Sequence, residues 1–229
     1  MRGKAGRLGA GSIKMIRGLV REPQLAVDLP RWIRDAPVRK DPLKFRRPWW
    51  NYAAVGFVER RLPEGAHVFE YGGGSSTLWL LDHGANVITV EDDDLWFRNL
   101  QRLVPDADLR FVPRTADSTP TAHGSFAAYS HAIDAEPDQS FDLVVVDGQA
   151  RRDCMLAAAP KVKPGGMLLL DDSQWSDTAP PGRERHRLRA PYADLPEHLR
   201  GWSVRHLRGL KPGTWLAVQT SIWIRPLRS

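Results

Sequence analysis

The sequence of 229 residues is poor in cysteine and has no long apolar run. Its single cysteine, Cys154, excludes a framework of internal disulfides and is typical of a protein from a reducing compartment. No stretch approaches the roughly 18 apolar residues that a membrane-spanning helix needs. The N-terminus carries charges but no apolar core of signal-peptide length. We therefore expect a cytoplasmic protein.

Acidic residues are scarce near the N-terminus. Residues 1–47 contain 13 Lys and Arg against 4 Asp and Glu (net +9), whereas the remainder contains 20 against 23 (net −3). We expect a basic extension over 1–47 and one domain over 48–229. Such an extension is either solvated or contacts an anionic substrate or a membrane surface. Its apolar and basic residues alternate at helical spacing: Ile13, Ile16, Leu19 and Val20 with Lys14, Arg17 and Arg21.

Strand and helix patterns alternate after residue 62. Strand patterns at 67–71, 86–91, 109–113, 141–147 and 167–171 are separated by helical patterns near 77–83, 95–103, 125–133 and 153–159. Such alternation predicts a parallel sheet covered on both faces. Later strand patterns at 202–207 and 214–225 flank the short turn GLKPG and must be antiparallel. We predict a doubly wound α/β fold, with a mostly parallel seven-stranded sheet and one antiparallel strand near the C-terminus.

The segment VFEYGGGSSTLWL (68–80) places an acid, three glycines and three hydroxyls between a strand and a helix. It contains no lysine, which excludes a P-loop for a nucleoside triphosphate. A dinucleotide fingerprint would need a glycine where Thr77 stands. Glu70 ends the strand in an acid, while Gly72 and Gly74 allow close backbone approach. These residues favour a cationic sulfonium nucleoside, S-adenosylmethionine (SAM), over a diphosphate.

A second strand-terminal acid, Glu91, ends the pattern NVITVE 21 residues after Glu70. Doubly wound folds place the acid that binds ribose hydroxyls at this distance. NAD and SAM both contain that ribose, so Glu91 does not discriminate between them.

These motifs resemble motif I of the class I SAM-dependent methyltransferases, in the variant form E-x-G-x-G-x-S-T. The resemblance covers residues 62–172, where NVITVED resembles the second motif, FDLVVVDG the fourth strand and KPGGMLLLDD the fifth. It implies a Rossmann-like fold, with Glu91 on the ribose and Asp92 and Asp117 near the adenine. The cofactor-binding residues that it implies are Glu70, Tyr71, Gly72, Gly73, Gly74, Ser75, Ser76, Thr77, Glu91, Asp92, Asp117 and Asp147.

Several carboxylates should gather where the parallel strands end, and they need a compensating cation. The SAM sulfonium is one such cation. Mg²⁺ is another, because DDSQW (171–175) is similar to the DN-x-x-W region of metal-dependent O-methyltransferases. We favour the alternative in which Asp147 and Asp171 orient the substrate without a metal.

The remaining candidates concern the methyl acceptor. For a hydroxyl acceptor, Asp147 and His131 are candidate general bases. Aromatic side chains before the first strand could stack on a sugar or a flat ring, and basic residues near the site would suit an anionic acceptor. The predicted substrate-binding residues are Trp49, Trp50, Arg151, Arg152, Asp171 and Asp172. No NPPY-like tetrad for methylating nucleic-acid bases is present.

The sequence therefore predicts a SAM-dependent methyltransferase that acts at oxygen on a small molecule or glycan. An aminopropyltransferase and an NAD(P)-dependent reductase are alternative enzymes. A non-catalytic adaptor that binds an anionic polymer through the basic arm is an alternative of another class.

Overall fold

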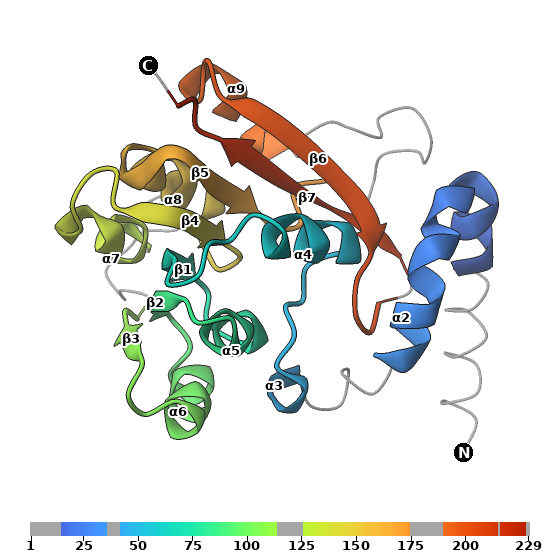
Figure 1. The fold of residues 1–229 in the computed structure, drawn as a ribbon. Coiled ribbons are helices and arrows are strands. Elements are labelled where there is room, and N and C mark those ends of the chain that lie inside the picture. The colour runs from blue at the N-terminus through green and yellow to red at the C-terminus, as the bar shows by residue number, and fades with distance from the viewer. Residues whose placement is uncertain (1–14, 36–41, 114–125, 175–189, 215, 228–229) are drawn as a thin grey trace.

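The computed structural model describes residues 15–35, 42–113, 126–174, 190–214 and 216–227. Seven strands form one sheet in the order β3-β2-β1-β4-β5-β7-β6 (Figure 1). Strand β7 is antiparallel to both of its neighbours, and the other pairs are parallel. This confirms the predicted fold. The strands are β1 (His67–Tyr71), β2 (Asn86–Glu91), β3 (Asp108–Phe111), β4 (Phe141–Val146), β5 (Val162–Leu170), β6 (Ser203–Leu210) and β7 (Ala217–Ile224).

Helices connect the strands close to where the sequence predicts them. None of those described is long and apolar enough to cross a membrane. The largest difference in bounds is in β5, which begins five residues earlier than predicted because Val162 already pairs with Phe141 before a register shift. The helices are α2 (Leu29–Arg34), α3 (Pro42–Phe45), α4 (Tyr52–Glu59), α5 (Ser75–Asp82), α6 (Asp94–Leu103), α7 (Ala127–Ser130), α8 (Arg151–Ala158) and α9 (Leu195–His198).

The sheet is buried on both faces because its central strands are apolar at most positions. In β4, Leu143 and Val145 join the core formed with α4 and α5, whereas Val144 and Val146 join the core formed with α7 and α8. This alternation follows from the two-residue period of a strand. The carboxyl ends of β1, β2, β4 and β5 therefore meet at one edge, between the two helical layers.

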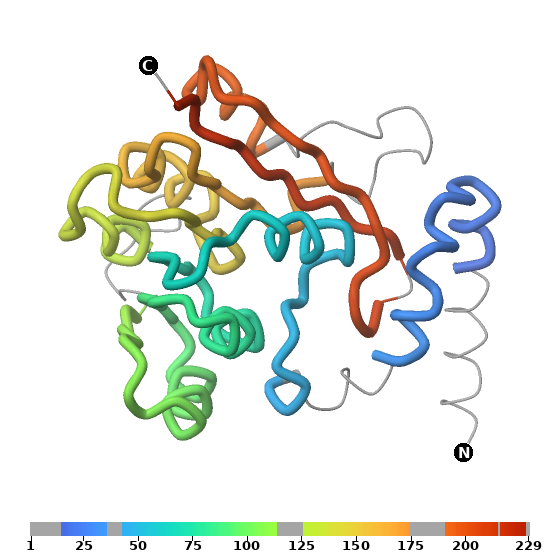
Figure 2. The backbone as a smooth tube through the Cα atoms, in the orientation of Figure 1, coloured from blue at the N-terminus to red at the C-terminus, as the bar shows by residue number. Residues whose placement is uncertain are grey.

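The N-terminal segment packs on the last two strands. After a helical turn at 15–21, the 3₁₀ helix η1 (Pro23–Asp28) and α2 lie beside the turn end of the β6–β7 hairpin, as Figure 2 shows. Asp28 accepts a hydrogen bond from the Leu210 amide at 2.9 Å, and the Trp32 indole donates one to the Thr214 carbonyl at 2.6 Å. Residues 15–35 are thus tied to the hairpin by contacts that span more than 180 positions in the sequence.

Asn51 joins the start of α4 to the same hairpin. Its side-chain oxygen accepts a hydrogen bond from the Ala54 amide at 2.9 Å, which caps the helix. Its amide nitrogen donates to the Leu207 carbonyl at 2.8 Å and to the Thr220 hydroxyl at 2.9 Å. Asn51, Ala54 and Thr220 are all fully buried, so the Ala54 amide and the Thr220 hydroxyl have no access to water in its place.

Asn51→Ala should lower the free energy of unfolding by about 2–4 kcal/mol, because it removes a helix cap and leaves buried partners unsatisfied. Asn86→Ala is the control, since the exposed Asn86 side chain makes one hydrogen bond, to the Gly65 carbonyl at 3.0 Å. Urea denaturation of both variants measures the difference. Equal losses would contradict the bridging role of Asn51.

Candidate functional site

A pocket of about 660 Å³ opens at the carboxyl ends of the parallel strands. The glycine turn after β1 and the end of β2 form one side of it, and the segment between β4 and α8 forms the other. Its lining residues are Trp49, Gly72, Gly73, Gly74, Ser75, Ser76, Glu91, Asp92, Trp96, Asp147, Gly148, Gln149, Ala150, Arg151, Arg152, Asp153, Asp172, Pro191 and Tyr192.

The backbone donors of the glycine turn are all used within the protein. The Gly72 amide donates to the Val90 carbonyl, the Gly73 amide to Oε2 of Glu91, and the Gly74 amide to Oγ1 of Thr77, each at 2.9 Å. A diphosphate at such a turn needs amides that point at the ligand. The turn therefore does not offer these three donors to an anion.

The turn packs backbone against backbone on the segment after β4. Gly72 has a φ of +87°, and a Cβ there would lie 2.7 Å from Cα of Gly148. A Cβ on Gly148 would lie 2.0 Å from the Tyr129 hydroxyl oxygen. Both positions require glycine, because a methyl group has no room at either. This contact fixes the spacing of the two sides of the pocket.

Glu70 lies beneath the glycine turn and not in the pocket lining. Oε2 of this fully buried carboxyl accepts hydrogen bonds from the hydroxyls of Thr77 and Thr89. Oε1 has no hydrogen-bond partner among the described residues. Burial raises the pKa of Glu70 to about 7. Thr77 therefore connects the acid to the turn, since its oxygen also accepts from Gly74.

Glu91 holds the other end of the turn and borders the pocket. Its Oε1 accepts from the amides of Asp92 and Asp93, both at 2.9 Å, and burial raises its pKa. The Trp96 indole donates to the Gly73 carbonyl at 2.5 Å. Glu91, Asp92 and Trp96 thus form one wall with the turn. Asp117, which was expected near an adenine, is outside the described residues.

Arg151 ties together the ends of β4 and β5. Its guanidinium donates to the carbonyl oxygens of Asp147 at 2.8 Å, Gly148 at 2.9 Å and Asp171 at 2.6 Å. It also lies 3.0 Å from Oδ1 of Asp147. Arg152 hydrogen bonds to Asp194, from Nε to Oδ2 at 3.0 Å. Both arginines line the pocket, as expected for substrate-binding residues, and they also hold these contacts within the protein.

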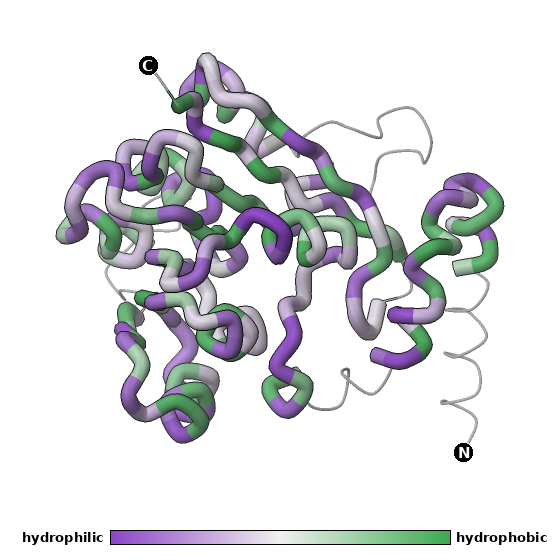
Figure 3. The backbone as a smooth tube through the Cα atoms, viewed as in Figure 1, coloured by the Kyte–Doolittle hydropathy of each residue, from purple (hydrophilic) through white to green (hydrophobic). Residues whose placement is uncertain are grey.

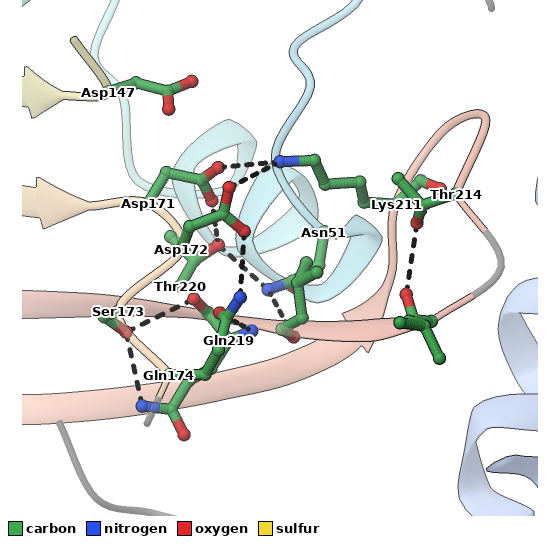
Figure 4. Close-up of polar contacts among 12 residues, drawn as sticks. Asn51, Asp147, Asp171, Asp172, Ser173, Gln174, Lys211, Thr214, Gln219 and Thr220 are labelled. Atoms are coloured by element: carbon green, nitrogen blue, oxygen red, sulfur yellow. Dashed lines mark hydrogen bonds and ion pairs between the residues drawn. The ribbon is translucent and has the colours of Figure 1, made fainter. Parts of the chain in front are cut away.

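Lys211, at the β6–β7 turn, forms ion pairs with two acids (Figure 4). Its ammonium nitrogen is 3.2 Å from Oδ2 of Asp171 and 3.1 Å from Oδ2 of Asp172. Asp171 is fully buried and also accepts from the Thr220 hydroxyl at 2.6 Å. Burial alone would lower the pKa of Lys211, but Asp171, Asp172 and Asp147 raise it above its usual value. The lysine is therefore the cation that this acidic pair requires.

This arrangement does not fit a magnesium site. Lys211 stands where a metal would have to bridge the two carboxylates, and a cation there would be repelled. Among the described residues, no three His, Cys, Asp or Glu side chains are grouped to hold a metal. Of the two acids, Asp172 borders the pocket and Asp171 does not. The expectation that Asp171 binds substrate is thereby corrected, because its carboxylate is buried against Lys211 and Thr220.

The carboxyl group of Asp147 borders the pocket, and its pKa lies near neutral pH. Burial, and next to it the charge of Asp171, raises the pKa of Asp147 to about 8, against the opposing effect of Arg151. His131, the other expected base, is exposed outside the pocket, where its Nδ1 lies 2.8 Å from Oδ2 of Asp134. The assignment of His131 as a base is therefore corrected.

Two further expected contacts are core contacts instead. Trp50 is fully buried and packs edge-to-face on Trp79, with ring centroids 6.2 Å apart, while its neighbour Trp49 is 40% exposed and borders the pocket. The Tyr71 side chain is buried and donates to the Ser130 carbonyl at 2.7 Å. Neither Trp50 nor Tyr71 offers its side chain to a ligand.

Among the contributors that sequence reasoning missed are Gly148, Trp96 and Lys211. Gly148 was readable, since it directly follows the strand-terminal Asp147 in VVVDG. Trp96 and Lys211 were not, because nothing in the local pattern shows that an indole on α6 or a lysine in a hairpin turn reaches the site.

No family model matches the chain, and no curated protein matches it. It is similar to the solved structure of a Burkholderia thailandensis 1,6-didemethyltoxoflavin-N1-methyltransferase with bound S-adenosylhomocysteine (17% identity, 90% of each chain, TM-score 0.49). It is also similar to Aeropyrum pernix fibrillarin with natively bound SAM (16% identity, 75% of this chain and 72% of that one, TM-score 0.49). A methyltransferase-like protein of Silicibacter pomeroyi is 22% identical over 76% of this chain and 86% of that one, with a TM-score of 0.46.

The raised pKa of Glu70 predicts a pH-dependent stability. Because the carboxyl is more easily protonated when folded, its contribution to stability is present below about pH 4.5 and is lost as the pH rises through about 7. Glu70→Gln keeps a neutral side chain of the same shape. Relative to the variant, the original protein should lose about 1–3 kcal/mol of unfolding free energy between pH 5 and pH 8. Urea denaturation at both pH values checks this, and parallel pH profiles would contradict it.

Lys211→Met should destabilise the protein by about 3 kcal/mol at pH 8, because it leaves buried carboxylates without their cation. The loss should be smaller at pH 5, where the raised pKa of Asp171 and of Asp147 lets these acids take up protons. Lys163→Met is the control, since Lys163 pairs with the partly exposed Asp142 at 2.7 Å and should cost less than about 1 kcal/mol. Similar losses in both variants would show that Lys211 holds no special pair.

Proposed function

We propose that this chain is a SAM-dependent methyltransferase that acts on a hydroxyl oxygen of a small molecule or glycan. The observation that carries the proposal is the charge of the pocket. Both lining arginines are committed to carbonyls and carboxylates, as described above. Three lining acids, Asp147, Asp153 and Asp172, pair with Arg151, Arg152 and Lys211. Glu91 and Asp92 remain as lining acids that form no ion pair among the described residues. Such a pocket favours a cationic ligand and disfavours a diphosphate.

The donors of the glycine turn support the same choice. A dinucleotide would have to compete with Val90, Glu91 and Thr77 for the three glycine amides, whereas a sulfonium nucleoside needs no phosphate cradle. Glu91 and Asp92 would hold the nucleoside end of SAM, and the turn would lie against its methionine end. SAM, when bound, supplies a methyl group on a positively charged sulfur. The mostly parallel sheet with a reversed strand near the C-terminus is also the fold that the sequence resemblance implied.

Asp147 supports oxygen as the methylated atom. A hydroxyl acceptor must lose a proton as it is methylated, and a base works best when its pKa lies near the working pH. Asp147 borders the pocket, and its pKa is raised to about 8. It would accept the hydroxyl proton, while the exposed ring of Trp49 would lie against a sugar or another flat acceptor.

Calorimetric titration of the purified chain with SAM, decarboxylated SAM and NAD tests the proposal. We expect SAM to bind, and Glu91→Ala to weaken its binding by about 1–3 kcal/mol through loss of hydrogen bonds to a charged group. Glu64→Ala, which changes an exposed acid, should leave the affinity unchanged. Circular dichroism of each variant checks that the fold is retained.

Each of the other outcomes of that titration favours a different function for this protein. Binding of NAD without SAM would favour the reductase. Binding of decarboxylated SAM in preference to SAM would favour the aminopropyltransferase, for which the acidic pocket is also suitable. Binding of none of the three would favour the non-catalytic adaptor.

A further inference from the structure

The N-terminal segment over residues 15–35, hereafter the N-terminal platform, exposes an unusual number of large apolar side chains. They are Ile16, Val20, Val27 and Ile33, with exposed fractions of 59%, 78%, 78% and 66%. Four of the ten exposed large hydrophobic residues of the described chain thus lie within these 21 residues. Figure 3 shows apolar and hydrophilic positions interspersed along this segment. Ile16 and Val20 lie four residues apart in the helical turn at 15–21 and therefore share one face, and contiguous apolar exposure of this kind marks an interaction surface.

All the acids of the platform are buried. Glu22, 8% exposed, forms an ion pair with Arg208 at 2.7 Å. Asp28, also 8% exposed, accepts from the Leu210 amide, and Asp35, 3% exposed, pairs with Arg34 at 2.9 Å. None of these carboxylates lies on the outer surface of the platform.

The charges that the platform exposes are all positive. Its exposed charged residues are Arg17, Arg21, Arg31 and Arg34. In sequence, the fourteen residues before it add four more basic residues and no acid. The fold has therefore turned acids inward and arginines outward, next to apolar side chains.

This combination selects among possible occupants. A second copy of the chain would bring its own arginines against these, which is repulsive. A neutral apolar partner would offer no anion to the exposed arginines. A membrane with anionic phospholipids satisfies both, since apolar side chains enter the boundary of the acyl region while arginines meet the head-group charges.

We propose that the N-terminal platform binds the surface of anionic phospholipid membranes. The platform is fixed to the hairpin by Asp28 and Trp32, so the bound protein would hold a defined orientation. This interaction does not depend on the methyltransferase proposal.

Co-sedimentation of the full chain with vesicles tests this. The protein should sediment with phosphatidylcholine vesicles that contain phosphatidylglycerol, and should stay in solution with phosphatidylcholine alone. Added salt should weaken the binding, because the head-group attraction is screened. Equal binding to both vesicle types, or none to either, would overturn the proposal.

Variants distinguish binding through the platform from nonspecific binding of the protein to vesicles. Ile16→Ser combined with Val20→Ser should reduce vesicle binding by about tenfold or more, because both side chains then lose apolar burial. Arg17→Gln combined with Arg31→Gln should reduce binding to anionic vesicles and its salt dependence.

The matched control is Leu95→Ser combined with Leu103→Ser, which removes two exposed apolar side chains from α6 (69% and 49% exposed). It should leave binding unchanged. Thermal melting should show all three variants folded, since the altered side chains are exposed. An unchanged affinity of the Ile16 and Val20 variant would overturn the proposal. Self-association without vesicles that this variant abolishes would assign the surface to a second copy instead.

Discussion

The gathering of carboxylates at one edge of the sheet is the constraint on which the rest of the structure depends. Parallel strands bring their carboxyl ends together, so the acids that end them meet in a region of low dielectric. The burial of each carboxylate is compensated by a different set of contacts. Glu70 accepts hydrogen bonds from two threonine hydroxyls, and Glu91 accepts them from three backbone amides. Asp147 forms an ion pair with Arg151, and Asp171 forms one with Lys211. The shape of the glycine turn and of the β4–α8 segment follows from these contacts.

The hairpin of β6 and β7 belongs to this system although it is distant in sequence. Its turn carries Lys211 to the edge, and Thr220 on β7 contributes a second partner for Asp171. Asn51 and the N-terminal segment then pack on the same hairpin. A segment that composition alone describes as a basic extension is in this way joined, through one hairpin, to the acidic edge of the sheet.

Much of the fold was predictable, because apolar strands and helical periodicity are local signals. The bounds of β1 and β2 match the sequence prediction, and so does the reversed β7 in its place near the C-terminus. The site was less predictable. Adjacent tryptophans, Trp49 and Trp50, differ in burial because of where the chain turns before α4, which composition does not encode. The partners of Arg151 and Lys211 lie up to 20 and 40 residues away and depend on how the strands assemble.

Thr77 bears on how such a site could change during evolution. Thr77 stands where the dinucleotide fingerprint has a glycine. Its hydroxyl accepts a hydrogen bond from the Gly74 amide and donates one to Glu70. A lone Thr77→Gly exchange would restore the fingerprint on paper while leaving an amide unpaired and a buried acid with one partner fewer. A route from this turn to a dinucleotide site therefore passes through a less stable intermediate unless Glu70 changes as well. Because Thr77 and Glu70 would have to change together, single substitutions seldom convert this turn.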